Sequence, residues 1–327
     1  MPRPRVFIAR EIPQEAVEKI NSSCLVDTWN SREPPSREAL LDGVRDADGV
    51  LCSLSERIDS ELMDSAPRIR VVSNMAVGYD NVDVPEATRR RIPIGNTPGV
   101  LTETTADLAF GLMLACARKI VEGDSVVRAG KWRYWDPLGF LGEDVHGATL
   151  GIIGFGKIGV AVAKRARGFG MRIIYYDIAR RPDTERELGV EFASLEKLLS
   201  ESDFVTIHTD LNPKTRHLIG AENLALMKKT SILVNTARGP IVDTSALYEA
   251  LKRGDIRGAA LDVTEPEPLP PTHPILSLDN VVVTPHIASG SRATRTKMAM
   301  LAADNLLAGL EGKRLPSCVN PEVYGTG

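Results

Sequence analysis

The chain has 327 residues, of which 43% are hydrophobic and 25% are charged, as in ordinary soluble globular proteins. This length predicts two domains rather than one. The formal net charge of −3 gives no electrostatic reason to expect nucleic acid or an anionic membrane as a partner, and no apolar stretch reaches the roughly 18 residues of a membrane-spanning helix.

The first hundred residues alternate between strand-like and helix-like segments. Short apolar runs predict strands, and the amphipathic segments between them predict helices. The N-terminus starts a strand within five residues and lacks the layout of a signal peptide. The expected strands are 5–9, 24–29, 49–54, 71–77 and 92–98, and the expected helices include 13–20 and 36–44.

The second part of the chain repeats this alternation. A long helix is expected over 102–130, followed by a polar, aromatic segment, 131–147. A helix over 246–254 is expected to stop at Gly254, and the last helix is expected at 294–312. The expected strands of this part are 149–156, 172–177, 203–209, 231–237, 258–263 and 280–286.

Both halves therefore look like open parallel sheets, which predicts an α/β fold of two Rossmann-like domains with the second inserted into the first. We expect one domain to comprise 1–99 and 289–327, and the other 100–288.

The four cysteines are scattered without a C-x-x-C pair, so we expect reduced thiols, no metal site and a cytoplasmic location.

A G-x-G-x-x-G motif follows the first strand of the second half and opens a helical pattern. Gly154 suits a tight turn, Gly156 lets backbone N–H groups approach a pyrophosphate, and Gly159 lets the helix pack against the strand. The helix N-terminus then favours phosphate groups. We expect the whole motif to contact a dinucleotide: Gly154, Phe155, Gly156, Lys157, Ile158 and Gly159.

Asp177 ends the next strand, 18 residues after Gly159. A carboxylate there can accept hydrogen bonds from the adenosine ribose and would repel a 2′-phosphate, which favours NAD(H). Arg180 and Arg181 follow closely and keep NADP(H) possible. Asp177 as a solvated turn residue is the alternative.

Charged residues follow three later strands of this half: Arg238, Asp262 with Glu267, and His286. Ligands of open α/β sheets bind beyond the carboxyl ends of the strands, so we expect these residues around one crevice. We expect Asp262 to receive the nicotinamide carboxamide. Further cofactor contacts are expected at the same strand ends, from Thr209, Thr236, Ala237 and Ser289.

These residue types suit the transfer of a hydride to a 2-keto acid. Arg238 can bind the carboxylate in a fork and polarise the ketone oxygen. The alkoxide that forms needs a proton from a group that titrates near neutrality, here His286. Glu267 would fix the tautomer of that imidazole. Taken singly, Arg238 could be in a surface ion pair, Glu267 a turn acid and His286 a histidine at the core edge.

These motifs resemble those of the D-isomer-specific 2-hydroxyacid dehydrogenases over nearly the whole chain. LGIIGFGKIG, NTARGPIVD, ALDVTEPEPLP and LDNVVVTPHIAS are similar to the family's cofactor, arginine, glutamate and histidine motifs, in that order. The resemblance implies a coenzyme domain inserted into a discontinuous, flavodoxin-like substrate domain. It also implies a homodimer that associates through the coenzyme domain.

Within the family, the sequence looks most like the glyoxylate/hydroxypyruvate reductases. In AVGYDNVD (76–83), this resemblance implies that the backbone N–H groups of Val77 and Gly78 hold the substrate carboxylate, and Gly78 tolerates the positive φ that such a turn uses. GKWRYWDPL implies that Trp135 reaches the neighbouring subunit's site, or else only lines the dimer interface. Val77 in place of lysine and Glu267 in place of glutamine disfavour phosphonate and formate dehydrogenases.

The sequence thus predicts an NAD(P)H-dependent reductase of small 2-keto acids, with glyoxylate and hydroxypyruvate as leading substrates. Oxidation of another D-2-hydroxy acid, such as D-glycerate, phosphoglycerate or D-lactate, is the enzymatic alternative. A non-enzymatic NAD-binding co-repressor is the other, because such proteins share the fold and the trio. His208 is expected to be structural, and His146, His217 and His273 to lie in turns or at the surface.

Overall fold

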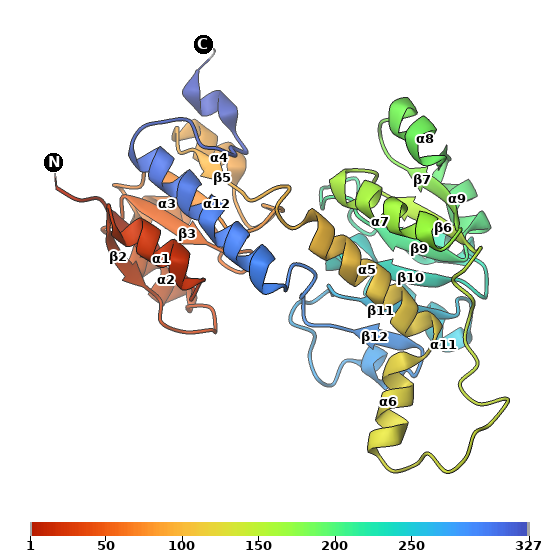
Figure 1. The fold of residues 1–327 in the computed structure, drawn as a ribbon. Coiled ribbons are helices and arrows are strands. Elements are labelled where there is room, and N and C mark those ends of the chain that lie inside the picture. The colour runs from red at the N-terminus through yellow and green to blue at the C-terminus, as the bar shows by residue number, and fades with distance from the viewer. Residues whose placement is uncertain (1, 326–327) are drawn as a thin grey trace. The chain divides into compact units, whose positions relative to one another are not determined.

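The computed structural model describes residues 2–325 and divides the chain into two compact units. The first unit joins two segments, Met1–Leu101 and Ser289–Gly327, and the second unit is the continuous segment Thr102–Ala288. Each has its own parallel sheet (Figure 1), which confirms the predicted fold class.

The first unit is built on a five-stranded sheet in the order β2-β1-β3-β4-β5, the flavodoxin-like order. Helices α1 and α12 pack together on one face, and α2, α3 and α4 bury their apolar residues in a cluster on the other. The strands are β1 Arg5–Ile8, β2 Leu25–Thr28, β3 Gly49–Cys52, β4 Val71–Asn74 and β5 Ile94–Gly95. The helices are α1 Gln14–Asn21, α2 Arg37–Val44, α3 Ser60–Ser65, α4 Val84–Arg89, α12 Arg292–Leu310 and the 3₁₀ turn η3 Pro321–Tyr324.

The second unit is built on a seven-stranded sheet in the order β12-β11-β10-β9-β6-β7-β8. From β8 inwards this is the doubly wound dinucleotide-binding order, extended by one strand. The chain order reverses between β6 and β9, so this is where a crevice is expected. The strands are β6 Thr149–Ile153, β7 Arg172–Tyr176, β8 Glu191–Phe192, β9 Phe204–Ile207, β10 Ile232–Asn235, β11 Gly258–Leu261 and β12 Val281–Val283.

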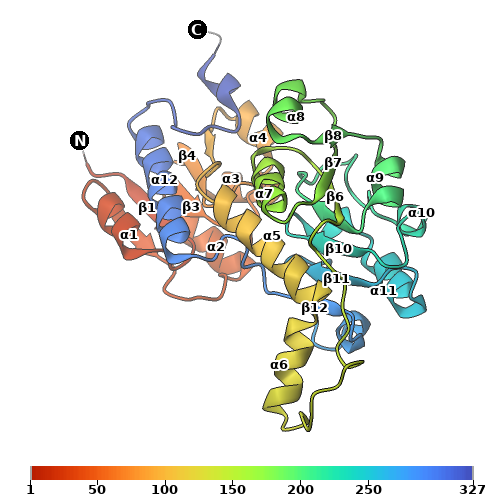
Figure 2. The same cartoon turned by 45° about the vertical axis from the view of Figure 1, so that its right-hand side comes forward.

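Helices cover both faces of this sheet (Figure 2). One buried cluster joins α5 and α7 to the strands, and a second joins α9, α10 and α11 to the opposite face. Because both faces are covered, most of the strands are apolar throughout rather than alternating. The helices are α5 Thr102–Ala117, α6 Ile120–Arg128, α7 Lys157–Gly168, α8 Pro182–Leu188, α9 Leu195–Glu201, α10 Ala221–Ala225, α11 Thr244–Arg253 and the 3₁₀ turns η1 Gly239–Ile241 and η2 Pro274–Ser277.

The single helix predicted over 102–130 is wrong, because the chain forms two helices, α5 and α6. Lys119 separates them with a left-handed φ of 52°. The Glu143 N–H donates to the Ala117 carbonyl at 2.9 Å, and a Cβ at Gly142 would lie 2.0 Å from that oxygen. A distant segment thus caps α5 where the helix was expected to continue. Helix α11, by contrast, stops at Gly254 as predicted, with a left-handed φ of 70°.

Candidate active site

The glycine motif forms a tight connection between β6 and α7. Gly154 has a φ of +88°, and a Cβ there would lie 2.6 Å from the Thr209 nitrogen at the end of β9. A Cβ at Gly159 would lie 2.3 Å from the Gly154 carbonyl oxygen. Both positions therefore require glycine on packing grounds. A Cβ at Gly156 would meet no atom within 4 Å, so the space beside this residue is open.

The loop fits the diphosphate of a dinucleotide. Helix α7 starts after Gly156, no side chain caps its first N–H groups, and its first turn contains no acidic residue. These N–H groups and the positive end of the helix dipole suit an anion, and the open space at Gly156 gives its oxygens room. Lys157 and Ile158 begin the helix, so their backbone lies at this end.

Asp177 follows β7 and is fixed beside the glycine loop. One carboxylate oxygen accepts a hydrogen bond from the Phe155 N–H at 2.7 Å, and the other lies 3.4 Å from the Ala179 nitrogen. The Phe155 ring is buried, so only the backbone of this residue belongs to the loop surface. The Asp177 carboxylate retains lone pairs for other donors, such as ribose hydroxyls.

His286 and Glu267 form a hydrogen-bonded pair beyond the carboxyl ends of β11 and β12. The His286 Nδ1 lies 2.5 Å from the Glu267 Oε1, and the two side chains are 21% and 33% exposed. Since an ionised carboxylate can only accept, Nδ1 carries the hydrogen in this pair. The Thr264 N–H points at the second Glu267 oxygen from 3.5 Å. Nε2 is thus the ring nitrogen available to a substrate.

Asp262 holds the loop that carries His286. This buried carboxylate accepts hydrogen bonds from the Thr284 hydroxyl at 2.6 Å and from the Ile287 and Ala288 N–H groups, both at 2.8 Å. The His286 N–H donates to the Asp262 carbonyl at 2.9 Å. Sequence reasoning missed this positioning role, and Asp262 as the partner of the nicotinamide carboxamide stays a prediction.

His286 itself adopts a left-handed backbone conformation with a φ of 53°. This conformation costs a non-glycine residue about 1 kcal/mol or more and persists only where the surroundings fix it. The Asp262 contacts supply that constraint. Strain of this kind at a titratable residue is typical of functional sites.

Arg238 follows β10, the neighbour of β11 in the sheet, and is half-buried. Its Nη1 donates to the Ala237 carbonyl at 2.9 Å. The buried Asn235 side chain, which sequence reasoning missed, donates to the Arg238 carbonyl at 2.9 Å and accepts from the Ala237 N–H at 3.0 Å. The Thr236 hydroxyl is buried, and no other described residue forms a hydrogen bond with it. Such a group suits a bound polar ligand.

The expected substrate loop lies in the first unit, after β4. The Asn96 side chain donates to the Val77 carbonyl at 2.9 Å, and the Asn74 side chain donates to the Gly78 carbonyl at 3.0 Å. Both carbonyls are thereby occupied, whereas the two N–H groups form no hydrogen bond with other residues in 2–325. Gly78 does not have a positive φ, so the loop makes no use of the conformational freedom that the sequence offered at this glycine. Ser289 also belongs to the first unit and is buried.

Comparison with known proteins decides the family. A sequence model described as "D-isomer specific 2-hydroxyacid dehydrogenase, NAD binding domain" matches residues 110–288. The chain belongs to this dehydrogenase family. The resemblance expected from the motifs is therefore confirmed.

Individual relatives of this dehydrogenase align over almost their whole length. A glyoxylate reductase of Korarchaeum cryptofilum is 55% identical over 322 residues, 98% of this chain and 97% of the relative. A crystal structure of a Thermus thermophilus protein has a TM-score of 0.90 at 47% identity and covers 96% of this chain and 99% of its own. An NADPH-dependent glyoxylate/hydroxypyruvate reductase of Sinorhizobium meliloti, solved with NADP and malonate, has a TM-score of 0.84 at 32% identity, with 98% of each chain covered.

The dehydrogenase exposes several large aromatic and apolar side chains on α6 and the segment after it. Both elements project from the second unit in Figure 1. Trp135 is 80% exposed, and helix α6 buries none of its residues. Such exposure is unusual for large apolar side chains. The exposed apolar residues here are Ile120, Val121, Val127, Trp132, Tyr134, Trp135, Leu138, Phe140 and Leu141.

The remaining histidines lie outside the pair. Burial lowers the pKa of His208 to about 3, so this residue is neutral at ordinary pH. It directly follows β9, and its Nε2 lies 2.9 Å from the Thr206 hydroxyl. His217 is exposed and pairs with Glu265 at 2.7 Å. The His273 ring accepts from the Ile275 N–H in a turn, and His146 is exposed.

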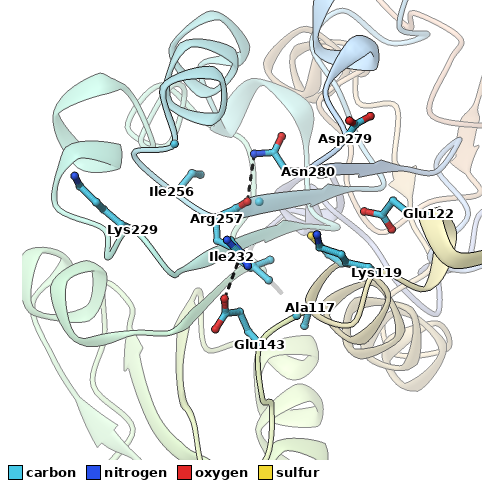
Figure 3. Close-up of a pocket in the computed structure, with 14 residues that line it drawn as sticks. Ala117, Lys119, Glu122, Glu143, Lys229, Ile232, Ile256, Arg257, Asp279 and Asn280 are labelled. Atoms are coloured by element: carbon cyan, nitrogen blue, oxygen red, sulfur yellow. Dashed lines mark hydrogen bonds and ion pairs between the residues drawn. The ribbon is translucent and has the colours of Figure 1, made fainter. Parts of the chain in front are cut away.

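A cavity of about 320 Å³ lies in the second unit, away from the pair (Figure 3). Ile232, Gly258 and Asn280 place it at the amino ends of β10, β11 and β12, opposite to the end where open α/β sheets bind their ligands. Figure 3 shows an ion pair between two of its lining residues, Arg257 and Glu143, whose nitrogen and oxygen lie 3.2 Å apart. This cavity therefore plays no part in the site built around His286.

Proposed function

We propose that this protein reduces glyoxylate and hydroxypyruvate to the corresponding 2-hydroxy acids, with NADH as the preferred cofactor. The observation that carries the proposal is the 2.5 Å hydrogen bond between His286 and Glu267, in the same unit as an uncapped phosphate-binding helix. The choice of substrate is supported by three relatives named glyoxylate reductases, which are 52–55% identical over nearly all of this chain.

The proposed chemistry divides between the cofactor and three side chains. A bound reduced nicotinamide supplies the hydride for the carbonyl carbon. Arg238 binds the substrate carboxylate and polarises the carbonyl oxygen, because its planar fork matches a carboxylate. His286 holds a proton at Nε2 for that oxygen, while Glu267 holds Nδ1 and so fixes the ring. The backbone N–H groups of Val77 and Gly78 stay proposed contacts of the substrate carboxylate, on the family resemblance alone.

The cofactor would be held by the glycine loop and Asp177. The α7 N-terminus binds the diphosphate, and the Asp177 carboxylate accepts hydrogen bonds from the ribose, which opposes a 2′-phosphate. Thr209, Thr236, Ala237, Asp262 and Ser289 complete the proposed cofactor contacts.

We also propose that the protein is a homodimer that associates through α6 and segment 131–141. Large exposed aromatic residues are typical of association surfaces, and Trp135 is the residue we expect to reach the neighbouring subunit. Light scattering on the intact chain tests this, and a monomer at micromolar concentration would contradict it.

The four free cysteines agree with a reducing compartment, in our proposal the cytoplasm.

The test of the activity is His286→Ala, compared with His217→Ala. Both histidines pair with a glutamate, but His217 is exposed and pairs with Glu265 instead of Glu267. We expect His286→Ala to lose about 10²–10⁴-fold in kcat with glyoxylate and to keep its NADH affinity, and His217→Ala to keep both. Parallel kinetics with hydroxypyruvate and pyruvate rank the substrates. Full turnover by His286→Ala would reject the proposed role.

A further inference from the structure

A series of contacts connects the glycine loop to helix α8, which lies beside β7 at the edge of the second unit (Figure 2). The buried rings of Phe155 and Tyr175 stack with their centroids 4.1 Å apart. The Tyr175 hydroxyl donates to the Glu185 Oε1 at 2.7 Å and accepts from the Arg181 N–H at 2.8 Å. Glu185 is thus held by the core of the dinucleotide loop and is not a freely moving surface acid.

Glu185 in turn binds Arg180, three residues beyond Asp177. The Arg180 Nε lies 3.0 and 3.1 Å from the two Glu185 oxygens, and Nη2 donates to Oε2 at 2.8 Å. The Glu185 side chain is only 11% exposed, against 63% for Arg180. The hydrogen bonds from Arg180 and Tyr175 lower the pKa of Glu185, so this carboxylate is ionised at neutral pH.

This pairing changes the charge that an adenosine 2′-phosphate would meet. An arginine shortly after the ribose-binding strand is the residue that accommodates such a phosphate. Here the Nε–Nη2 edge of Arg180 is occupied by a fixed carboxylate, and the pair is neutral overall. Asp177, three residues before Arg180, adds a second carboxylate to this segment. A 2′-phosphate of nearly −2 would therefore be repelled by the Asp177 carboxylate and would have to compete with Glu185 for the Arg180 guanidinium.

We propose that Glu185 is a specificity-determining residue that withholds Arg180 from the 2′-phosphate and so excludes NADPH in favour of NADH. The inference rests on the proposed dinucleotide function. Asp177 is the direct acceptor in this scheme, and Glu185 acts through Arg180. Removing the negative charge of Glu185 leaves a free guanidinium at the position where NADP(H) presents its extra phosphate.

The test is Glu185→Gln in the full-length protein, with binding measured by calorimetry for NADH, NADPH, 5′-AMP and 2′,5′-ADP. Glutamine retains an oxygen for the Tyr175 hydroxyl and removes only the charge. We expect affinity for NADPH and 2′,5′-ADP to rise about tenfold and affinity for NADH and 5′-AMP to change by less than about twofold, as for one partly exposed charge-assisted contact. Adding Arg180→Ala to Glu185→Gln should abolish the gain.

The matched control is Glu191→Gln, which removes the same charge from another ion pair of this sheet edge, with Arg172 at 2.9 Å. It should leave all four affinities unchanged. Should Glu185→Gln fail to fold, the double variant Arg180→Ala, Glu185→Ala is decisive, because it removes the neutral pair as a whole and the inference expects the weak NADPH affinity to stay as it is. Weaker NADPH binding by this double variant would overturn the inference.

Three further results separate this inference from the proposed activity. Unchanged 2′,5′-ADP affinity in Glu185→Gln, or a gain that survives Arg180→Ala, would overturn the role of Glu185 and leave the activity untouched. Failure to reduce glyoxylate, with the expected nucleotide affinities, would reject the substrate and support the role of Glu185. Absence of NADH and 5′-AMP binding in the unaltered protein would overturn both.

Discussion

Replacing Asp262 by alanine should release the loop that carries His286. The change removes the acceptor of three hydrogen bonds, from the Thr284 hydroxyl and from the Ile287 and Ala288 N–H groups, and leaves the buried Ala288 N–H unpaired. An unsatisfied buried donor costs about 1–3 kcal/mol, and each partly buried bond contributes about 0.5–1.5 kcal/mol. We therefore expect the free energy of unfolding of the second unit to fall by about 3–4 kcal/mol.

Asp243→Ala is the matched control for this change. Asp243 is also an aspartate of the second unit that accepts from two backbone N–H groups, Ser245 and Ala246, both at 3.0 Å, but it caps helix α11 at a partly exposed position. Loss of such a cap costs about 1 kcal/mol. Urea denaturation gives the two free energies, and amide hydrogen exchange of Ile287 and Ala288 reports on the loop itself.

The two variants should differ in activity as well. A loop without Asp262 no longer holds His286 in its left-handed conformation, so we expect kcat with glyoxylate to fall at least about tenfold, while Asp243→Ala retains it. The reasoning fails if Asp262→Ala is no less stable than Asp243→Ala, or if the Ile287 and Ala288 amides exchange as slowly as before.

Three further predictions test the site. Glu267→Gln should lower kcat with glyoxylate by about 10–100-fold at constant NADH affinity, because the amide removes the charge that holds the imidazole; an unchanged pH–rate profile would argue against this. Burial lowers the pKa of His208 to about 3, so between pH 7 and pH 5 acid protonates this imidazole only in the unfolded chain. Over that range the free energy of unfolding of the unaltered protein should fall by about 2 kcal/mol more than that of His208→Asn. Urea denaturation at each pH measures both, and equal losses would contradict this. Gly156→Ala should weaken NADH binding at least about tenfold and change the free energy of unfolding by less than about 1 kcal/mol, because its Cβ meets no atom of the protein. Gly159→Ala should lower the free energy of unfolding by about 1–3 kcal/mol, because its Cβ meets the Gly154 carbonyl oxygen. Similar shifts of the melting temperature in both variants would refute this steric argument.

Much of the fold could be predicted because the deciding signals are local. The β-branched runs mark buried strands, and the three glycines follow the first of them at the spacing that a strand–turn–helix connection needs. The family motifs carry the same local information, which is why the fold class and the family were correct.

The misses arise where distant parts of the chain decide the conformation. The break at Lys119 depends on the approach of Gly142 and Glu143 to the end of α5, and a helical pattern contains no trace of that approach. Strand β8 has two residues and therefore no periodicity. The positioning role of Asp262 depends on donors 22–26 residues further along, so the strand-end rule found the residue without finding its partners.

The two edges of the seven-stranded sheet restrict how copies of this protein can meet. One edge is β8, with two residues, and the other is β12, with three. Pairing through an edge strand needs a long row of unsatisfied backbone groups, and rows this short offer almost no template for an incoming strand. Self-association by ladder extension, the route to fibrils, is thereby disfavoured. Any stable assembly of the second unit must instead use interlocking side chains, where single aromatic substitutions have large effects.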